Sequence, residues 1–265
     1  MSDLILTSTQ NPAIKQVRKL HRSKERKRQN LLLLEGNNSV ASALANRFPL
    51  VTVFCTAKWQ ERHPLLWQSF TDRDLRVQLV SSEVLKSIAT TVNPDGVVAT
   101  ARRAISQTPS ADSVKLGLAV ETLQDPGNLG TIIRTAVATE VDRLWLSEDS
   151  VDLDNPKVLR ASVGEWFRLP MAVPPNLQDA IANQKQQGVQ IVATVPQSKQ
   201  TYWDLDLTLP TLLLIGNEGA GLSSELISLA NKQISIPLAN EVESLNAAIA
   251  TGLILYEAKR QRKSQ

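Results

Sequence analysis

The sequence has very few of the side chains that bind transition metals or form disulfide bonds. Its 265 residues include one cysteine, Cys55, and two histidines, His21 and His63. A single thiol excludes an intramolecular disulfide and a cysteine-based metal cage. Because all three residues lie before residue 64, the rest of the chain works without imidazole or thiol. A Ser-His-Asp triad, a cysteine nucleophile and a histidine-ligated zinc site are therefore excluded from the C-terminal half, and we expect no metal.

Long apolar runs are also missing. Stretches such as residues 212–215 are strand-sized, far below the roughly 18 residues needed to cross a bilayer. The first four residues lack the basic-then-apolar layout of a secretion signal. We therefore expect a cytoplasmic protein with no membrane partner.

Positive charge is concentrated at the start of the chain. The overall net charge is +3, but residues 1–30 hold eight basic side chains against Asp3 and Glu25. The eight are Lys15, Arg18, Lys19, Arg22, Lys24, Arg26, Lys27 and Arg28. A second basic cluster, residues 259–263, lies near the other end. Such density attracts phosphate backbones, although a solvated helix face would look the same. We predict that Arg26, Lys27 and Arg28 contribute to nucleic-acid binding.

Hydrophobic periodicity predicts two α/β domains. Strand-like segments at residues 31–34, 50–54, 77–80 and 97–100 alternate with helix-length stretches. A polar, proline-containing stretch at residues 106–113 is the best linker candidate. A second series of strands follows at residues 116–120, 143–146, 190–193, 211–215 and 233–236, again separated by helices. We place the domains at residues 1–105 and 106–265 and expect an α/β fold for both.

A glycine-rich loop, residues 216–223, follows one of these strands and precedes a helix. Its spacing overlaps the phosphate-binding loop of NTPases, but Leu222 stands where that pattern requires lysine. Without this cation an NTPase is disfavoured. A simple turn between strand and helix is the alternative.

Two further segments contain polar or charged side chains that could take part in binding or catalysis. In residues 125–134, Asn128 lies at the start of a predicted helix and Arg134 lies about one turn further along it. Residues 234–246 form a strand, a loop and a helix start that contains Ser244. Taken singly, Asn128 and Ser244 are more often helix caps, and Arg134 is more often a partner in a surface ion pair.

Together, the three segments closely resemble the signature motifs of the SpoU, or TrmH-like, family of RNA ribose 2′-O-methyltransferases. The motifs are Asn128-x-Gly130-x-Ile132-x-Arg134-x-Ala136, then Leu213 to Leu222 around Gly216-Asn217-Glu218-Gly219, then Ile236-Pro237 with Glu243-Ser244-Leu245-Asn246. The stretch from Lys157 to Gly164 also looks like the family, as does the opening from Ser8 to Lys15.

The resemblance implies a parallel sheet with a deep trefoil knot in the C-terminal domain, and general rules of chain topology would have argued against a knot. It also implies a homodimer with the active site near the subunit interface, S-adenosylmethionine as cofactor, and an N-terminal RNA-binding domain resembling a small ribosomal protein. Ribosomal RNA is the substrate it favours. A transfer-RNA enzyme and a catalytically inactive RNA-binding paralogue are the alternatives.

Site residues follow from the same resemblance. Gly216, Ile236 and Leu245 would line the cofactor pocket with Thr194 at its rim, although core packing would equally suit Ile236 and Leu245. Arg134 would orient and charge-stabilise the acceptor ribose, supported by Asn128, Glu218, Ser244 and Asn246, with Glu218 as the alternative base. Arginine is a poor general base because its guanidinium normally stays protonated. The sequence departs from relatives at Glu165 and Trp166, where small or apolar residues are common, and at Asn240-Glu241, where a glycine is often found. We expect these departures to affect the fit to RNA.

Overall fold

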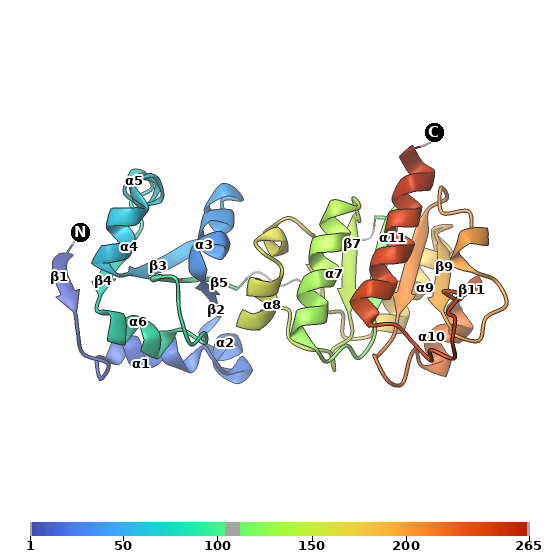
Figure 1. The fold of residues 1–265 in the computed structure, drawn as a ribbon, viewed down its shortest axis with the longest axis horizontal. Helices are drawn as coiled ribbons and strands as arrows, with labels where there is room; N and C mark the ends of the chain where they lie inside the picture. The colour runs from blue at the N-terminus through green and yellow to red at the C-terminus, as the bar shows by residue number, and fades with distance from the viewer. Residues whose placement is uncertain (1, 104–111, 264–265) are drawn as a thin grey trace. The chain divides into compact units, whose positions relative to one another are not determined.

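The computed structural model describes residues 2–103 and 112–263, which fold into two compact units (Figure 1). The first unit contains the described residues up to 103 together with Asp152–Phe167, and the second contains the remainder. The predicted linker lies outside the described residues up to position 111. Among the helices described, none is long and apolar enough to span a membrane.

The first unit is built on a five-stranded sheet in the order β1-β4-β3-β5-β2, in which β5 runs antiparallel to both of its neighbours. All four predicted strands are confirmed, and only the edge strand β1 was missed. The elements are β1 Ser2–Leu6, α1 Pro12–Lys19, α2 Ser23–Gln29, β2 Leu31–Glu35, α3 Gly36–Ala45, β3 Leu50–Cys55, α4 Ala57–Arg62, α5 Pro64–Asp72, β4 Val77–Val80, α6 Ser82–Ile88 and β5 Val97–Arg102. The helices α1 and α6 pack on one sheet face through Ile14, Val84 and Ile88, which are fully buried.

The segment Asp152–Phe167 packs with the first unit, although the sequence prediction assigned all of residues 106–265 to the second domain. It contains α8 (Pro156–Ala161) and the short helix η1 (Glu165–Phe167). Phe48 meets Trp166 edge-on with ring centroids 5.7 Å apart, and the Trp166 indole donates to the Leu153 carbonyl at 2.8 Å. Trp166 is one of the departures from the family pattern. Here it anchors the segment in an apolar cluster.

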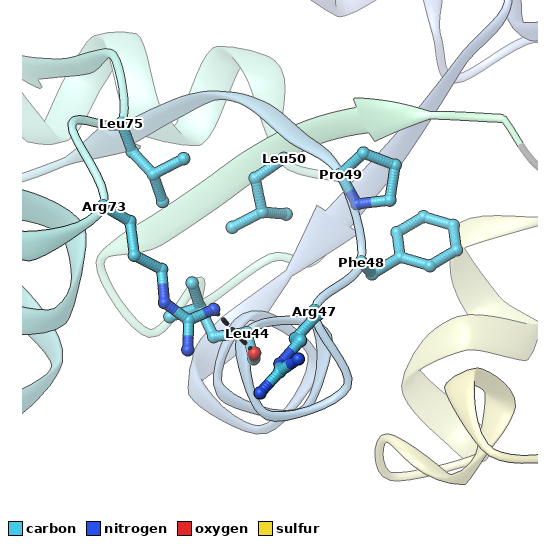
Figure 2. Close-up of a pocket in the computed structure, with 7 residues that line it drawn as sticks. All are labelled: Leu44, Arg47, Phe48, Pro49, Leu50, Arg73 and Leu75. Carbon is cyan, nitrogen blue, oxygen red and sulfur yellow. Dashed lines mark hydrogen bonds between the residues drawn. The ribbon is translucent and has the colours of Figure 1, made fainter.

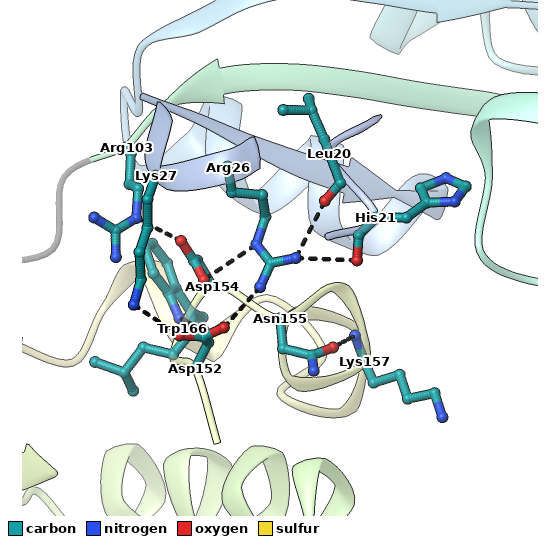
Figure 3. A network of polar contacts seen from close by, with 11 residues as sticks. Leu20, His21, Arg26, Lys27, Arg103, Asp152, Asp154, Asn155, Lys157 and Trp166 are labelled. Carbon is teal, nitrogen blue, oxygen red and sulfur yellow. Dashed lines mark hydrogen bonds and ion pairs between the residues drawn. The ribbon is translucent and has the colours of Figure 1, made fainter. Parts of the chain in front are cut away.

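A buried ion-pair network fixes the same segment (Figure 3). Arg26 is 2% exposed and donates through Nε to Asp154 and through Nη2 to Asp152, both at 3.1 Å. Arg103 also pairs with Asp154, which is fully buried. The prediction that Arg26 binds nucleic acid is therefore wrong, because its guanidinium is enclosed by the protein. Lys27 remains largely exposed.

The second unit has a six-stranded, entirely parallel sheet in the order β11-β9-β10-β6-β7-β8. Its elements are β6 Leu116–Val120, α7 Pro126–Ala138, β7 Arg143–Leu146, β8 Met171–Ala172, α9 Leu177–Gln186, β9 Gln190–Thr194, η2 Tyr202–Asp204, β10 Thr211–Ile215, α10 Ser224–Leu229, β11 Lys232–Ile234 and α11 Ala247–Lys263. The predicted parallel sheet is confirmed. Only the two-residue strand β8 was missed, and β11 ends two residues earlier than expected.

The helices α7 and α11 lie side by side in the second unit (Figure 1). A Cβ added at Gly252 would lie 3.8 Å from the Thr135 methyl, which is ordinary van der Waals contact, so the packing of the two helices does not require glycine there. The C-terminal basic cluster partly serves this packing, because Lys259 donates to the Ala138 carbonyl at the end of α7. Arg262 donates to the carbonyls of Lys115, Leu207 and Leu209, and burial lowers its pKa.

Candidate functional site

A pocket of about 510 Å³ opens at the carboxyl ends of three neighbouring strands of the second unit. Its walls come from the loop after β9, the loop after β10, and the chain from the end of β11 into α11. Six of the nine predicted site residues line it: Thr194, Gly216, Glu218, Ile236, Ser244 and Leu245. Loops at the carboxyl edge of a parallel sheet are a usual place for ligands.

The loop after β10 closes tightly on itself. A Cβ at position 216 would lie 2.2 Å from the carbonyl carbon of Gly221, so only glycine fits there. Asn217 and Gly221 exchange two backbone hydrogen bonds of 3.0 Å. The Asn217 side-chain oxygen accepts from the amides of Gly219 and Ala220 at 2.9 and 3.0 Å. Thus Gly216 permits a preformed pocket wall.

Three side chains join the three sequence motifs. Asn246 donates through Nδ2 to Oδ1 of Asn128 at 2.9 Å, and Asn128 donates through Nδ2 to Oε1 of Glu218 at 3.0 Å. A carboxylate can only accept, so its bond fixes the orientation of the Asn128 amide, and this in turn directs the Asn246 amide. The segments around residues 128, 218 and 246 are therefore tied together at the pocket.

Helix capping falls to other residues than the sequence suggested. Asp125 caps α7, because its Oδ1 accepts from the amide of Asn128 at 2.7 Å. The final helix begins at Ala247 rather than at Ser244, and the side-chain oxygen of Asn246 accepts from the amide of Ala248 at 2.9 Å. The alternative interpretation of Asn128 and Ser244 as caps is wrong, which leaves both free for the site.

Arg134 lies apart from this constellation. It is exposed on α7, and within residues 2–103 and 112–263 it makes no hydrogen bond or ion pair. It lies six positions after Asn128 along α7, a helical rise of about 9 Å. The structure thus brings Asn128, Glu218 and Asn246 together and leaves Arg134 outside the pocket of its own chain.

Several residues that hold the site were not predicted. Glu121 follows β6 and accepts from both the amide and the hydroxyl of Ser223 at 2.7 Å, which ties the sheet to the start of α10. The Asn217 amide donates to the Thr122 carbonyl at 2.8 Å. Both Glu121 and Thr122 come directly after a buried strand, a position from which their role could have been inferred.

The departure at Asn240-Glu241 has a conformational cost. Both residues adopt left-handed backbone, with φ of +56° and +59°. Glycine tolerates this region without penalty, whereas other residues lose stability there. The structure therefore explains why a glycine suits this loop. No group of three or more His, Cys, Asp or Glu side chains in the described ranges is placed to hold a metal ion.

Known proteins resemble this chain along nearly its whole length. A model of the SpoU rRNA methylase family matches residues 115–256, and a model of an MRM3-like substrate-binding domain matches residues 11–99. An uncharacterized tRNA/rRNA methyltransferase of Synechocystis is 48% identical over 97% of this chain and 94% of the relative. The 23S rRNA (guanosine(2553)-2′-O)-methyltransferase RlmP of Bacillus subtilis is 30% identical over 96% of this chain and 98% of that protein.

Solved structures agree with these matches. The AdoMet-bound rRNA methyltransferase of Sinorhizobium meliloti is 33% identical and superposes with a TM-score of 0.86, covering 97% of both chains. The parallel sheet, the tied motif loops and the family match over residues 115–256 lead to one assignment. The chain belongs to the SpoU rRNA methylase family.

Proposed function

We propose that this protein transfers a methyl group from S-adenosylmethionine to a ribose 2′-hydroxyl of ribosomal RNA. The observation that carries the proposal is the hydrogen-bonded series Asn246, Asn128 and Glu218, which joins three distant motifs beside one pocket. Relatives named as 23S rRNA 2′-O-methyltransferases support the RNA class. A ribosomal RNA substrate would place the reaction in the cytoplasm.

The pocket fits a cofactor of this size and polarity. Its volume of about 510 Å³ falls within the roughly 300–1,000 Å³ of small-molecule sites. Ile236 and Leu245 offer apolar walls, Thr194 stands at the end of β9, and Gly216 brings bare backbone to the surface. When bound, S-adenosylmethionine supplies an electrophilic methyl group. These four residues would hold it with the methyl accessible to RNA.

The acceptor side needs an aligned hydroxyl and a place for its proton. Alignment supplies much of the rate in such displacements. We assign orientation and charge stabilisation of the RNA to Arg134, because guanidinium pairs well with phosphate. Asn128, Ser244 and Asn246 would hold Glu218 and the motif loops in place. Glu218 is the alternative proton acceptor, since a carboxylate takes a proton far more readily than an arginine.

An exposed apolar stripe on α11 favours a homodimer. Ile249, Leu253 and Tyr256 lie on one face of α11 and are 57%, 40% and 57% exposed. Such an apolar stripe on a helix is typical of a surface that another chain covers. We propose that a second copy packs here and that Arg134 acts within the assembled dimer. Sedimentation should give a dimer, and the double substitution Ile249→Glu with Leu253→Glu should give monomers.

We extend the proposal to two features of the fold. The final segment after β11 would thread through a loop to make a trefoil knot, consistent with the likeness to solved SpoU structures. The first unit would bind the RNA substrate, consistent with its match to a substrate-binding domain.

Mapping of 2′-O-methylation in RNA from a deletion strain tests the function. One ribosomal position should lose its methyl group and regain it with the wild-type gene but not with Arg134→Ala. Loss of a transfer-RNA methyl group instead would contradict the ribosomal assignment. Calorimetry separates the inactive paralogue, because a protein that binds no S-adenosylmethionine even at millimolar concentration cannot be the enzyme. Arg134→Ala should keep wild-type cofactor affinity.

A further inference from the structure

A second pocket, of about 460 Å³, lies in the first unit at the carboxyl ends of β2, β3 and β4. Its walls come from the starts of α3, α4 and α6 and from the loop that leads into β5. None of the nine predicted site residues lies here. The size of the pocket falls within the usual range of small-ligand sites, roughly 300–1,000 Å³.

Three cations line this pocket without a protein partner. Lys58, Arg62 and Lys86 make no hydrogen bond or ion pair in the described part of the chain. Asp95 is the one acidic residue among the described lining residues, and it already accepts from the amide of Asn37 at 3.3 Å. All three cations are exposed, and the described lining side chains carry more positive than negative charge, which favours binding of an anion.

An aromatic stack forms one wall. Trp59 is 2% exposed and lies between the rings of His63 and Phe70, with centroid distances of 4.7 and 5.9 Å and interplanar angles of 15° and 12°. The Trp59 carbonyl holds Nδ1 of His63 at 2.9 Å. A carbonyl only accepts, so Nδ1 carries a proton and Nε2 remains available. The half-buried His63 ring is thus fixed in orientation before any ligand arrives.

The loop opposite the stack is equally fixed. A Cβ at Gly96 would lie 2.9 Å from Cβ of Trp59, so this glycine, with φ of +104°, lets the loop press against the tryptophan. Val92, two residues before the lining residue Pro94, is 88% exposed. An exposed apolar side chain so close in sequence to the pocket lining is suited to contact a sugar or base.

Another pocket in the same unit is less suited to bind a ligand, because two of its side chains already have protein partners (Figure 2). It measures about 390 Å³ and lies where β3 and β4 begin, with Arg47 and Arg73 at its sides. Arg73 already donates to the Leu44 carbonyl at 2.8 Å, which caps the end of α3. Its aromatic residue, Phe48, packs on Trp166 and Phe167.

We propose that the pocket around His63 binds one nucleotide of the RNA substrate. The phosphodiester would pair with Lys58, Arg62 and Lys86, and the base would stack on the His63 ring. Splayed nucleotides are commonly recognised by such a combination of cations and a stacking ring. The inference rests on the proposed function and adds to it a specific contact outside the methyl-transfer pocket.

Fluorescence anisotropy of the full chain with labelled 23S ribosomal RNA from the deletion strain tests the proposal. The pocket variant is Lys58→Ala with Arg62→Ala and Lys86→Ala. The matched control is Arg47→Ala with Arg76→Ala and Arg102→Ala, which removes the same charge from exposed positions of the same unit outside both the pocket and the basic run at residues 15–28. The pocket variant should bind at least tenfold more weakly than the control. Equal affinities of the two would overturn the proposal, because they would mean that only net charge matters.

The stacking ring has its own test. His63→Ala should weaken RNA binding by roughly five- to hundredfold, as expected for a lost base stack, whereas His63→Phe should stay within about threefold of wild type. Wild-type affinity in His63→Ala, or equal loss in both variants, would contradict the stacking role. The affinity for S-adenosylmethionine, measured by calorimetry, should be the same in all of these variants as in the wild type. If the wild type binds RNA but transfers no methyl group, the proposed function fails and the pocket proposal stands. If the wild type transfers methyl groups normally but the pocket variant binds RNA as well as the control does, the pocket proposal fails and the proposed function stands.

Discussion

Replacing Arg26 with methionine should strongly destabilise the first unit. The guanidinium makes four donations in the folded state: to Asp154 and Asp152 at 3.1 Å, to the Leu20 carbonyl at 3.1 Å and to the His21 carbonyl at 3.3 Å (Figure 3). Methionine fills a similar apolar volume but donates nothing, so the substitution isolates the polar contribution.

The magnitude follows from what stays buried. Asp154 is fully buried and would keep Arg103 as its only cation, while two backbone carbonyls would lose their donor. Removing one member of a buried ion pair costs about 3–5 kcal/mol. Since Asp154 keeps one partner, we expect a loss near the lower end, about 3 kcal/mol. At a urea dependence of about 2 kcal/mol per molar, the unfolding midpoint falls by roughly 1.5 M.

Urea titration followed by tryptophan fluorescence measures this shift, with the transition of the first unit analysed separately from that of the second. Lys27→Met is the matched control: its ammonium lies 3.6 Å from Asp152 and its side chain is 58% exposed, so the loss should stay below about 1 kcal/mol. A midpoint for Arg26→Met equal to that of the control would refute the reasoning. Since Arg26 is enclosed, the RNA contact expected of this basic run passes to the exposed Lys27 and Arg28.

Three smaller perturbations test other parts of the structure. Gly216→Ala should reduce S-adenosylmethionine affinity at least tenfold in calorimetry, because its Cβ would meet the Gly221 backbone at 2.2 Å. Gly219→Ala is the control and should bind the cofactor normally, since its Cβ would meet only a side-chain atom, at 3.7 Å. Equal affinities of the two variants would be inconsistent with the closed loop. Glu241→Gly should raise the free energy of unfolding by about 0.5–1 kcal/mol in urea titration by relieving left-handed backbone at φ +59°, and a decrease would count against that strain. Burial raises the pKa of Cys55 to about 12, so a disulfide reagent at mildly alkaline pH should modify it only after unfolding; rapid modification of the folded protein would show that the thiol is accessible.

Much of the fold could be predicted because its strands are uniform apolar runs bounded by polar turns. Residues 116–120 and 211–215 are buried at every position, and both strands match the prediction to the residue. Strand β1 lies at a sheet edge, and β8 has two residues, which is too short for a periodic signal. The packing of Asp152–Phe167 with the first unit could not be predicted, because pairs such as Arg26 with Asp154 are separated by 128 residues.

Gly216, Ile236 and Leu245 could be named in advance through the resemblance to the SpoU motifs, and they line a pocket at the ends of β10 and β11. The motifs did not show which partner each side chain contacts. Asn128 looked like a helix cap, yet Asp125 takes that role and leaves the amide to Glu218. Arg134 looked central, yet a helical rise of about 9 Å separates it from Asn128 within one chain. Such distances depend on helix geometry and assembly rather than on residue type.

The order of synthesis imposes a delay on the first unit. Arg26 and Arg103 leave the ribosome well before Asp154, and Phe48 well before Trp166, so these partners are absent when residue 103 emerges. At about 5–20 residues per second, translation reaches the end of Asp152–Phe167 roughly 3–13 seconds later. Until then the Arg26 guanidinium and the Phe48 ring lack these partners, although all five strands of the sheet have already been synthesised. A chain that stopped before Asp152 would keep the strands but leave both side chains without these contacts.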